Sequence, residues 1–263
     1  MDGGPTSSSN GSQGADEVAT VADARRAEVQ YARSSDNARI YKAELRRLTA
    51  PGSVRVLDVG GGAKPTLRLT RIENEQIDYV VTDIDAEELA AAPAEYRKVA
   101  GDVLERETIM RLLDTGGQFD VVISRWVAEH MRDGRAFHEN VFSLLAPGGT
   151  AVHLFPTLYA VPFMVNRILA DRISRRLLFN FTKRDVKFPA HYSWCYGPTE
   201  RQLSGLRDVG FEIERYVGFF GHGFFAPVAP VHAAYRRLVH TLMRHPVPSL
   251  TAFAVAVLKR PAA

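Results

Sequence analysis

The sequence predicts an α/β domain in which a parallel sheet is covered by helices on both faces. Short, continuous apolar runs alternate with amphipathic segments between residues 54 and 155. The first run meets three glycines, and an acidic residue follows each of the next two runs. The chain has 263 residues, of which 46% are hydrophobic and 24% charged, so it is long enough and apolar enough to bury one large core.

The N-terminal region predicts where this domain begins. The first 16 residues are rich in Gly and Ser and are expected to form a disordered tail, which leaves residues 17–263 as a single domain. Residues 18–48 contain helix formers without Pro or Gly. They predict an N-terminal helical cap over 17–50 that ends at Pro51 and Gly52.

Five apolar runs predict the first strands, and the segments between them predict helices. The strands are expected at Val54–Val59, Ile77–Thr82, Tyr96–Ala100, Phe119–Ser124 and Thr150–Phe155. The helices are expected at Thr66–Ile72, Ala86–Ala91, Leu104–Leu113 and Gly134–Leu145. Apolar strands of this kind are typical of a parallel sheet that is buried on both faces.

The pattern changes after Phe155. Residues 156–196 predict a lid insertion with one helix, Phe163 to Phe179, that carries apolar residues on one side and arginines elsewhere. Regular structure then resumes as helix, strand, helix and strand. These elements are expected at Thr199–Val209, Phe211–Val217, Pro230–Arg244 and Leu250–Leu258.

Several classes of protein are disfavoured by composition. Cys195 is the only cysteine, so an intrachain disulfide and a cysteine-rich metal site are excluded. The sequence has no apolar stretch of membrane-spanning length, and its first residues lack the basic start and apolar core of a secretory signal. A net charge of +3 does not by itself imply nucleic-acid binding. We therefore expect a cytoplasmic protein without stable membrane insertion.

The most informative segment is the glycine-rich turn after the first predicted strand. Gly60, Gly61 and Gly62 permit positive φ angles and let a ligand approach the backbone at the start of the next helix. A dinucleotide fingerprint needs glycine where Pro65 stands, and the sequence contains no P-loop string. Asp58, on the strand itself, favours a ligand with a cationic group beside the turn.

Acidic residues also end the next two predicted strands. Asp83 closes the second strand, 25 residues after Asp58, and Asp102 follows the third. All three lie at the carboxyl edge of the predicted sheet, where open α/β sheets bind ligands. A carboxylate at the position of Asp83 can accept hydrogen bonds from two ribose hydroxyls.

Five motifs, in order and at natural spacing, resemble those of class I S-adenosylmethionine-dependent methyltransferases of the small-molecule type. They are VLDVGGG, VVTDID, AGDVLE, FDVVISRWVAEHM and LLAPGGTAVHLF, at residues 56–62, 80–85, 100–105, 119–131 and 144–155. Lys64 departs from the pattern, because many members place another glycine there. The resemblance implies a Rossmann-like, doubly wound, seven-stranded sheet that is mostly parallel, with the last strand antiparallel.

The resemblance also implies S-adenosylmethionine as cofactor and S-adenosylhomocysteine as product. Asp58 is expected near the cofactor amine, although the alternative is that it caps N–H groups of the turn. Asp83 is expected on the ribose and Asp102 beside the adenine. The full expected cofactor set is Asp58, Gly60, Gly61, Gly62, Asp83, Ile84, Asp102, Val103, Ser124, Arg125 and Trp126.

A general base is needed if the methyl acceptor is a hydroxyl or an acidic carbon. The candidates are His191, His130 and Glu129. Glu129 and His130 resemble the Glu-His pair of quinone-biosynthesis O-methyltransferases, some of which hold a metal. Trp126 stands where that arrangement has an acid, so no metal is expected. The alternative for His130 is packing at a helix start.

The acceptor is expected to be a small molecule, a largely apolar or aromatic compound such as a secondary metabolite, methylated on a hydroxyl. The expected acceptor-binding residues are Tyr31, Tyr41, Phe155, Tyr159, Phe163, Tyr192, Trp194, Phe220 and His222. Methylation on nitrogen or carbon, or a non-catalytic cofactor-binding interaction protein, are the alternatives. Nucleic-acid methylation is disfavoured, because residues 124–127 read SRWV and not a base-flipping motif. An apolar face could also pair two copies as a homodimer.

Charge is distributed unevenly along the predicted domain. Residues 51–155 hold 11 basic and 17 acidic residues, whereas residues 156–263 hold 15 basic and 6 acidic ones. An acidic cofactor half suits a cationic sulfonium donor. A basic acceptor half favours an acceptor that carries a carboxylate or phosphate.

Overall fold

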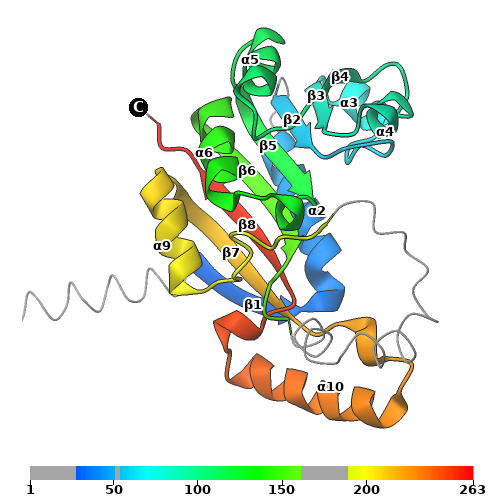
Figure 1. Ribbon diagram of the computed structural model, residues 1–263, viewed down its shortest axis with the longest axis vertical. Helices are drawn as coiled ribbons and strands as arrows, with labels where there is room; N and C mark the ends of the chain where they lie inside the picture. Colours follow the sequence, from blue (N-terminus) through cyan, green and yellow to red (C-terminus); the bar gives the residue numbers. More distant parts are fainter. Residues whose placement is uncertain (1–27, 51–53, 161–188, 263) are drawn as a thin grey trace, which may run out of the picture.

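The computed structural model describes residues 28–50, 54–160 and 189–262. Within these ranges a mixed sheet of eight strands forms the centre, in the order β1-β7-β8-β6-β5-β2-β3-β4 (Figure 1). The strands are β1 (Val29–Arg33), β2 (Arg55–Val59), β3 (Asp78–Asp83), β4 (Arg97–Ala100), β5 (Phe119–Arg125), β6 (Leu145–Pro156), β7 (Glu212–Phe220) and β8 (Phe253–Lys259). Only β8 runs antiparallel to its neighbours, so the doubly wound, mostly parallel sheet expected from the sequence is confirmed.

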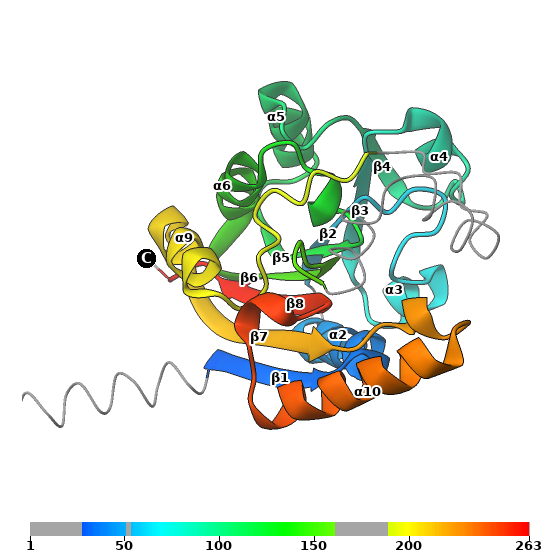
Figure 2. The same ribbon diagram turned by 60° about the horizontal axis from the view of Figure 1, so that its bottom comes forward.

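Helices cover both faces of the sheet (Figure 2). The first face packs against α2 (Asn37–Thr49), α3 (Leu69–Asn74) and α4 (Ala86–Ala90), and the second against α5 (Arg106–Asp114), α6 (Gly134–Leu144) and α9 (Glu200–Val209). Helix α10 (Ala229–Arg244) packs near β1 and β7. Short 3-10 turns occur at Ser34–Asp36, Ala128–His130, Gly223–Phe225 and Pro248–Leu250.

The central strands are apolar throughout because both faces of the sheet are buried. Leu57 and Val122 contribute to the core under α5, α6 and α9, whereas Val56 and Ile123 contribute to the core under α2, α3 and α4. All four side chains are fully buried. Neighbouring residues of one strand therefore serve opposite cores, which explains the continuous apolar runs.

The expected helical cap over 17–50 is wrong at Val29–Arg33, which forms the strand β1. This strand pairs in parallel with β7, from Tyr216 to Phe220, and makes the sheet eight-stranded where seven strands were expected. The segment lacks Pro and Gly, and its local sequence resembles a helix. Pairing with the edge of β7 overrides that local preference. The expected tail at residues 1–16 and the expected lid helix Phe163 to Phe179 lie outside the described residues.

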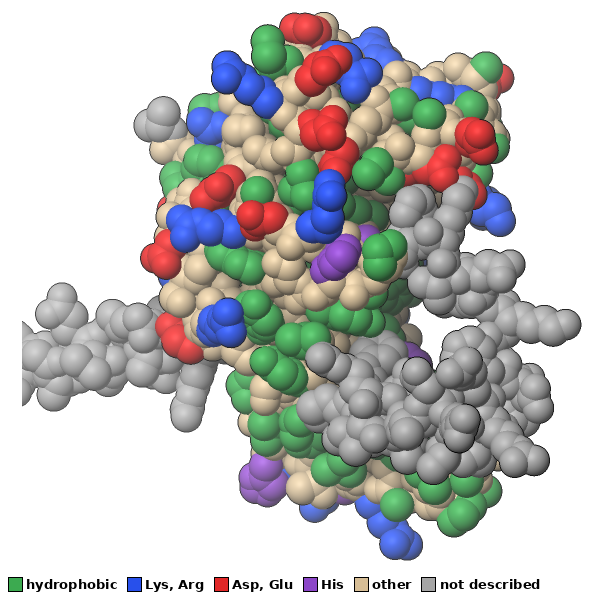
Figure 3. Space-filling model, in the orientation of Figure 1, with side chains coloured by type: hydrophobic (Ala, Val, Ile, Leu, Met, Phe, Trp, Pro, Cys, Tyr) green, Lys and Arg blue, Asp and Glu red, His purple; other side chains and the backbone are tan. Residues whose placement is uncertain are grey.

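Acidic side chains are unevenly distributed over the visible face of the molecule. On the face shown in Figure 3 they gather over the end that holds α4 and α5, and are fewer at the end that holds α10. Helix α10 contains three arginines and no carboxylate. The charge asymmetry of the sequence is thus also an asymmetry in space.

Candidate functional site

The glycine turn closes tightly against the loop that follows β5. Gly60 and Gly62 have φ angles of +73° and +46°, which non-glycine residues rarely adopt. A Cβ atom at Gly60 would lie 2.3 Å from Cγ2 of Val127. The backbone N–H of Gly60 donates to the carbonyl of Thr82 at 2.8 Å, which ties the turn to β3.

A cavity of about 500 Å³ opens where β2, β3, β4 and β5 end. We call it the glycine-turn cavity. Six of the eleven expected cofactor residues line it, namely Gly60, Asp83, Ile84, Asp102, Val103 and Trp126. The two histidines that are candidate bases, His130 and His191, line it as well. The carboxyl ends of adjacent parallel strands thus bring together residues that are distant in the sequence.

Two carboxylates lie on this cavity. Asp83 is half-buried, and burial raises its pKa although the backbone N–H groups of Asp85 and Gly62 donate to it. Asp102 accepts from the N–H of Leu104 at 2.9 Å, and its Oδ2 lies 3.5 Å from Arg132. Ile84 also lines the cavity and is 57% exposed, so the cavity offers an apolar surface beside hydrogen-bond acceptors.

Asp58, the residue expected near a cofactor amine, forms hydrogen bonds with the loop after the glycine turn and with β3. Its carboxylate is buried, does not line either cavity, and accepts from Thr66 N–H at 2.7 Å, from Thr66 Oγ1 at 3.2 Å and from the hydroxyl of Tyr79. Burial raises its pKa, and these hydrogen bonds oppose the rise. This geometry supports the alternative, in which Asp58 holds the loop after the glycine turn.

The remaining expected cofactor residues also lie outside the glycine-turn cavity. The Ser124 side chain is buried on the face of the sheet that α6 covers, where its hydroxyl lies 2.7 Å from Nδ1 of His153. A Cβ at Gly61 would lie 2.4 Å from Cγ1 of Val81, and one at Gly62 would lie 3.3 Å from Asp83, so these glycines shape the turn. Arg125 lines a different cavity, described below.

Backbone hydrogen bonds join the two segments that carry the candidate bases. The N–H groups of His191 and Tyr192 donate to the carbonyl of Glu129 at 2.8 and 2.9 Å, which anchors residues 189–196 beside the turn Ala128–His130. His130 Nδ1 lies 3.0 Å from the carbonyl of Pro189. Glu129 does not line the glycine-turn cavity; its side chain is buried, and burial raises its pKa to about 8.

Of the expected acceptor-binding residues that the structure describes, only Tyr41 lines one of the two cavities. Phe155 and Phe220 are fully buried in the core, because they occupy inward-facing strand positions. Tyr31 stacks on Phe220, Tyr159 is 38% exposed, Tyr192 and Trp194 pack against the core, and His222 stacks on Phe253. Phe163 lies outside the described residues. The structure therefore places most of this set in packing positions.

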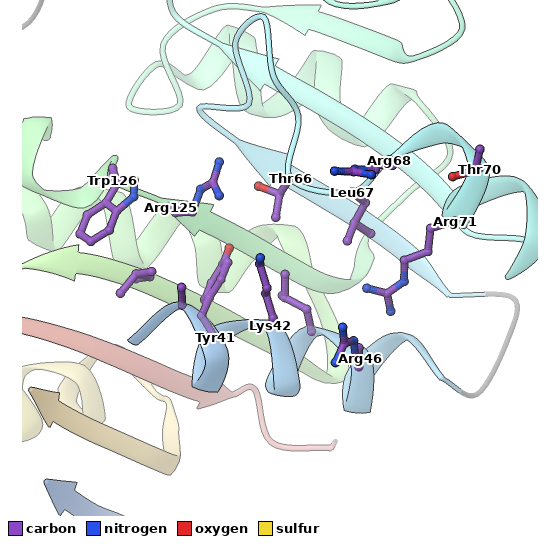
Figure 4. Close-up of a pocket in the computed structure, with 13 residues that line it drawn as sticks. Tyr41, Lys42, Arg46, Thr66, Leu67, Arg68, Thr70, Arg71, Arg125 and Trp126 are labelled. Carbon is purple, nitrogen blue, oxygen red and sulfur yellow. The ribbon is translucent and has the colours of Figure 1, made fainter. Parts of the chain in front are cut away.

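A second cavity, of about 330 Å³, separates α2 from the loop after the glycine turn (Figure 4). We call it the basic cavity. Its cationic lining consists of Lys42, Arg46, Arg68, Arg71 and Arg125. Sequence reasoning missed four of these residues. The four-residue spacing of Lys42 and Arg46, which puts both on one helix face, is the signal that could have found the first two.

Trp126 is the residue that both cavities share. Its φ angle is +62°, an unusual value for a bulky residue, and its side chain is 39% exposed. The ring packs edge-on against Phe253, with ring centroids 5.4 Å apart. Strained backbone of this kind is concentrated at functional sites, and here it occurs at a residue that lines both cavities.

The described ranges contain neither a candidate metal site nor a candidate membrane-spanning helix. No three His, Cys, Asp or Glu side chains there come close enough together to hold a metal ion. None of the helices in that part of the chain has the length and hydrophobicity that crossing a membrane requires.

Residues 57–151 match the family described as a methyltransferase domain. The chain is 35% identical over 115 residues to an uncharacterised methyltransferase of Mycobacterium sp. strain JLS, which is 44% of this chain and 43% of that protein. An uncharacterised methyltransferase of Mycolicibacterium gilvum strain PYR-GCK is 32% identical over 116 residues, 44% of each chain. These matches span less than half of the curated relatives.

Solved structures share the fold at low sequence identity. A S-adenosylmethionine-dependent methyltransferase of Archaeoglobus fulgidus aligns over 84% of this chain and 94% of its own, with a TM-score of 0.51 and 18% identity. Phosphoethanolamine N-methyltransferase 2 of Haemonchus contortus, in complex with phosphomonomethylethanolamine and S-adenosylhomocysteine, aligns over 85% of this chain and 52% of its own, with a TM-score of 0.50 and 15% identity. At these identities the similarity shows the fold.

Proposed function

Because this chain carries a class I S-adenosylmethionine-dependent methyltransferase domain, we propose that it binds S-adenosylmethionine in the glycine-turn cavity and transfers the methyl group to a small molecule. One observation carries this proposal. Gly60, Asp83 and Asp102 reach the same cavity from the ends of three adjacent strands. We further propose that residues 17–263 act as one unit and that the protein works in the cytoplasm.

The chemistry of the cavity fits this cofactor. The carboxylate of Asp83 suits the two ribose hydroxyls, and Asp102 suits an exocyclic amine of adenine. Ile84 and Val103 offer apolar surface to the flat base. The cofactor supplies an electrophilic methyl group on a sulfonium, so the protein needs chiefly to align the acceptor with it and to exclude water.

A hydroxyl acceptor must also lose a proton, and we propose His130 or His191 as its base. The carbonyl of Pro189 accepts a hydrogen bond from Nδ1 of His130, which leaves the basic lone pair on Nε2. Oε1 of Glu129 lies 3.8 Å from Nε2, so the Glu129 carboxyl borders the proposed base. Transfer to nitrogen or carbon, and a non-catalytic interaction protein, are the competing functions.

Titration calorimetry with S-adenosylhomocysteine tests the binding step. Asp83→Asn removes a charged acceptor of the ribose hydroxyls and should weaken binding about tenfold or more. Asp85→Asn is the matched control, because it removes the same charge two residues away, where the side chain caps α4 and asparagine caps equally well. A wild-type protein without measurable affinity for S-adenosylhomocysteine would refute the proposal.

Transfer itself is tested by incubating the protein with labelled cofactor and metabolite extracts, and identifying the methylated product by mass spectrometry. With the product known, His130→Ala and His191→Ala should each lower turnover far more than cofactor affinity. Near wild-type turnover in both variants would exclude them as bases. Cofactor binding without any product would favour the non-catalytic function.

A further inference from the structure

We propose that the basic cavity binds an anionic group, a carboxylate or a phosphate, of the methyl acceptor. This inference rests on the proposed function and names a chemical class for the acceptor. The apolar part of such an acceptor would lie on Leu45, Leu67 and Leu154, which line the same cavity. The cofactor would occupy the neighbouring glycine-turn cavity.

Charge is the first observation that supports an anionic ligand. Five cationic side chains line the basic cavity, and none of its described lining residues is acidic. Arg71 is engaged, because Glu75 accepts from it at 2.8 Å. The side chains of Lys42, Arg46, Arg68 and Arg125 form no ion pair with any residue in the described ranges. Cations gathered around one concavity repel each other, and an anion in it would stabilise them all.

Tyr41 is the second, independent observation. Tyr41 is 2% exposed. Its hydroxyl has no hydrogen bond of ordinary geometry with any described residue, although the side-chain hydroxyl of Thr66 lies nearby. Burial and the charge of Asp58 raise the pKa of Tyr41 well above its usual value, so the hydroxyl keeps its proton. Figure 4 shows the hydroxyl pointing from α2 toward Arg125 and Thr66. A buried donor without a partner is rare, and here it faces a cluster of cations.

The position of Trp126 connects the basic cavity to the proposed methyl donor. Trp126 lines both cavities and directly follows Arg125, so a ligand held at Arg125 lies next to the glycine-turn cavity. An acceptor anchored by its anionic end could therefore place a nucleophile past Trp126. Anchoring of this kind uses remote binding energy to orient the reacting atoms.

The carboxylate of the cofactor itself is the other possible source of an anion. In S-adenosylmethionine that carboxylate shares a carbon atom with an ammonium group. Asp58 is the buried carboxylate whose charge acts on Arg125 and Tyr41, but it does not line the cavity. The four cations without an ion pair in the described ranges would repel the ammonium, and none of the described lining residues offers it a carboxylate. The charge pattern of the cavity therefore favours an anion that carries no adjacent positive charge, which is why we assign the site to the acceptor.

The test uses the protein saturated with S-adenosylhomocysteine, with inorganic phosphate as the probe and calorimetry as the measurement. Phosphate should bind this complex. The Arg125→Gln substitution should lower the affinity for phosphate at least about tenfold, since a charge-assisted hydrogen bond is lost. Tyr41→Phe should also weaken phosphate binding, without lowering the melting temperature of the phosphate-free protein. A purely structural tyrosine hydroxyl would lower that temperature when removed.

Arg47→Gln is the matched control, because Arg47 lies beside Arg46 on α2 but pairs with Glu44 and Glu214 outside the cavity. It should leave phosphate binding unchanged. A wild-type complex that binds S-adenosylhomocysteine but not phosphate would overturn this inference alone. A second result would also overturn it. If Arg125→Gln bound S-adenosylhomocysteine more weakly but bound 5′-methylthioadenosine, which lacks the carboxylate, as the wild type does, Arg125 would hold the cofactor carboxylate. Loss of all cofactor affinity in the wild type would instead refute the proposed function.

Discussion

The buried carboxyl of Glu129 should make the stability of the domain depend on pH, and Glu129→Gln should remove that dependence. The residue is 6% exposed, and its Oε2 atom has no hydrogen-bond partner within the described ranges. Burial raises its pKa from 4.5 to about 8. Between those values the folded protein holds a proton that the unfolded chain has lost. The free energy of unfolding therefore falls as the pH rises through this window.

The size of the effect follows from the pKa shift. Each pKa unit corresponds to about 1.4 kcal/mol, so the shift from 4.5 to about 8 corresponds to at most about 5 kcal/mol. The stabilising contribution of the protonated carboxyl is complete below pH 4.5 and lost above about pH 8. Glutamine has nearly the same shape and does not ionise. The variant should match the wild type in acid and exceed its melting temperature by up to about 10 °C in mild alkali.

Differential scanning calorimetry at about pH 5 and about pH 8.5 measures this difference. Glu139→Gln is the control, because Glu139 is an exposed glutamate on α6 that pairs with Arg135. It should change the melting temperature by a similar small amount at both pH values. The reasoning would be refuted if Glu129→Gln shifted the melting temperature equally at both pH values, since Glu129 would then ionise at an ordinary pKa.

Two further predictions concern local geometry. Gly60→Ala should lower both the melting temperature and the affinity for S-adenosylhomocysteine, because the new Cβ would lie 2.3 Å from Val127 Cγ2 at a φ of +73°. Gly148→Ala has a similar φ of +80° and open space around it, so it should show only the backbone strain of about 1–2 kcal/mol. Asp133→Ala should cost about 1 kcal/mol in urea unfolding, because Asp133 accepts from two N–H groups at the start of α6, whereas Asp133→Asn should restore most of that loss.

The sequence predicts the sheet well because each strand carries its own signal. Val56 and Leu57 are buried in opposite cores, and that double burial is visible as a continuous apolar run. The lining residues Gly60, Asp83 and Asp102 follow from the same signal. They stand at strand ends, and parallel topology alone brings those ends to one edge.

The contacts of side chains within strands are harder to predict, because their partners lie far away in the sequence. Asp58 turns to Thr66 and Tyr79, which the sequence separates from it by 8 and 21 residues, and no local pattern shows that contact. Ser124 points into the opposite core and reaches His153. The basic cavity combines four separate segments, so no single motif contains it.

The pairing of β1 with β7 has a consequence for the order of assembly. Val29 aligns with Tyr216, so the first described strand has its partner near the other end of the chain. During synthesis β1 cannot dock until β7 has emerged, whereas the strands β2 to β5 can already pair with one another. Helix α2 follows β1 after the short turn Ser34–Asp36 and forms one wall of the basic cavity. The strand that precedes this wall therefore docks only after the strands β2 to β5, whose ends carry the glycine-turn cavity, have emerged.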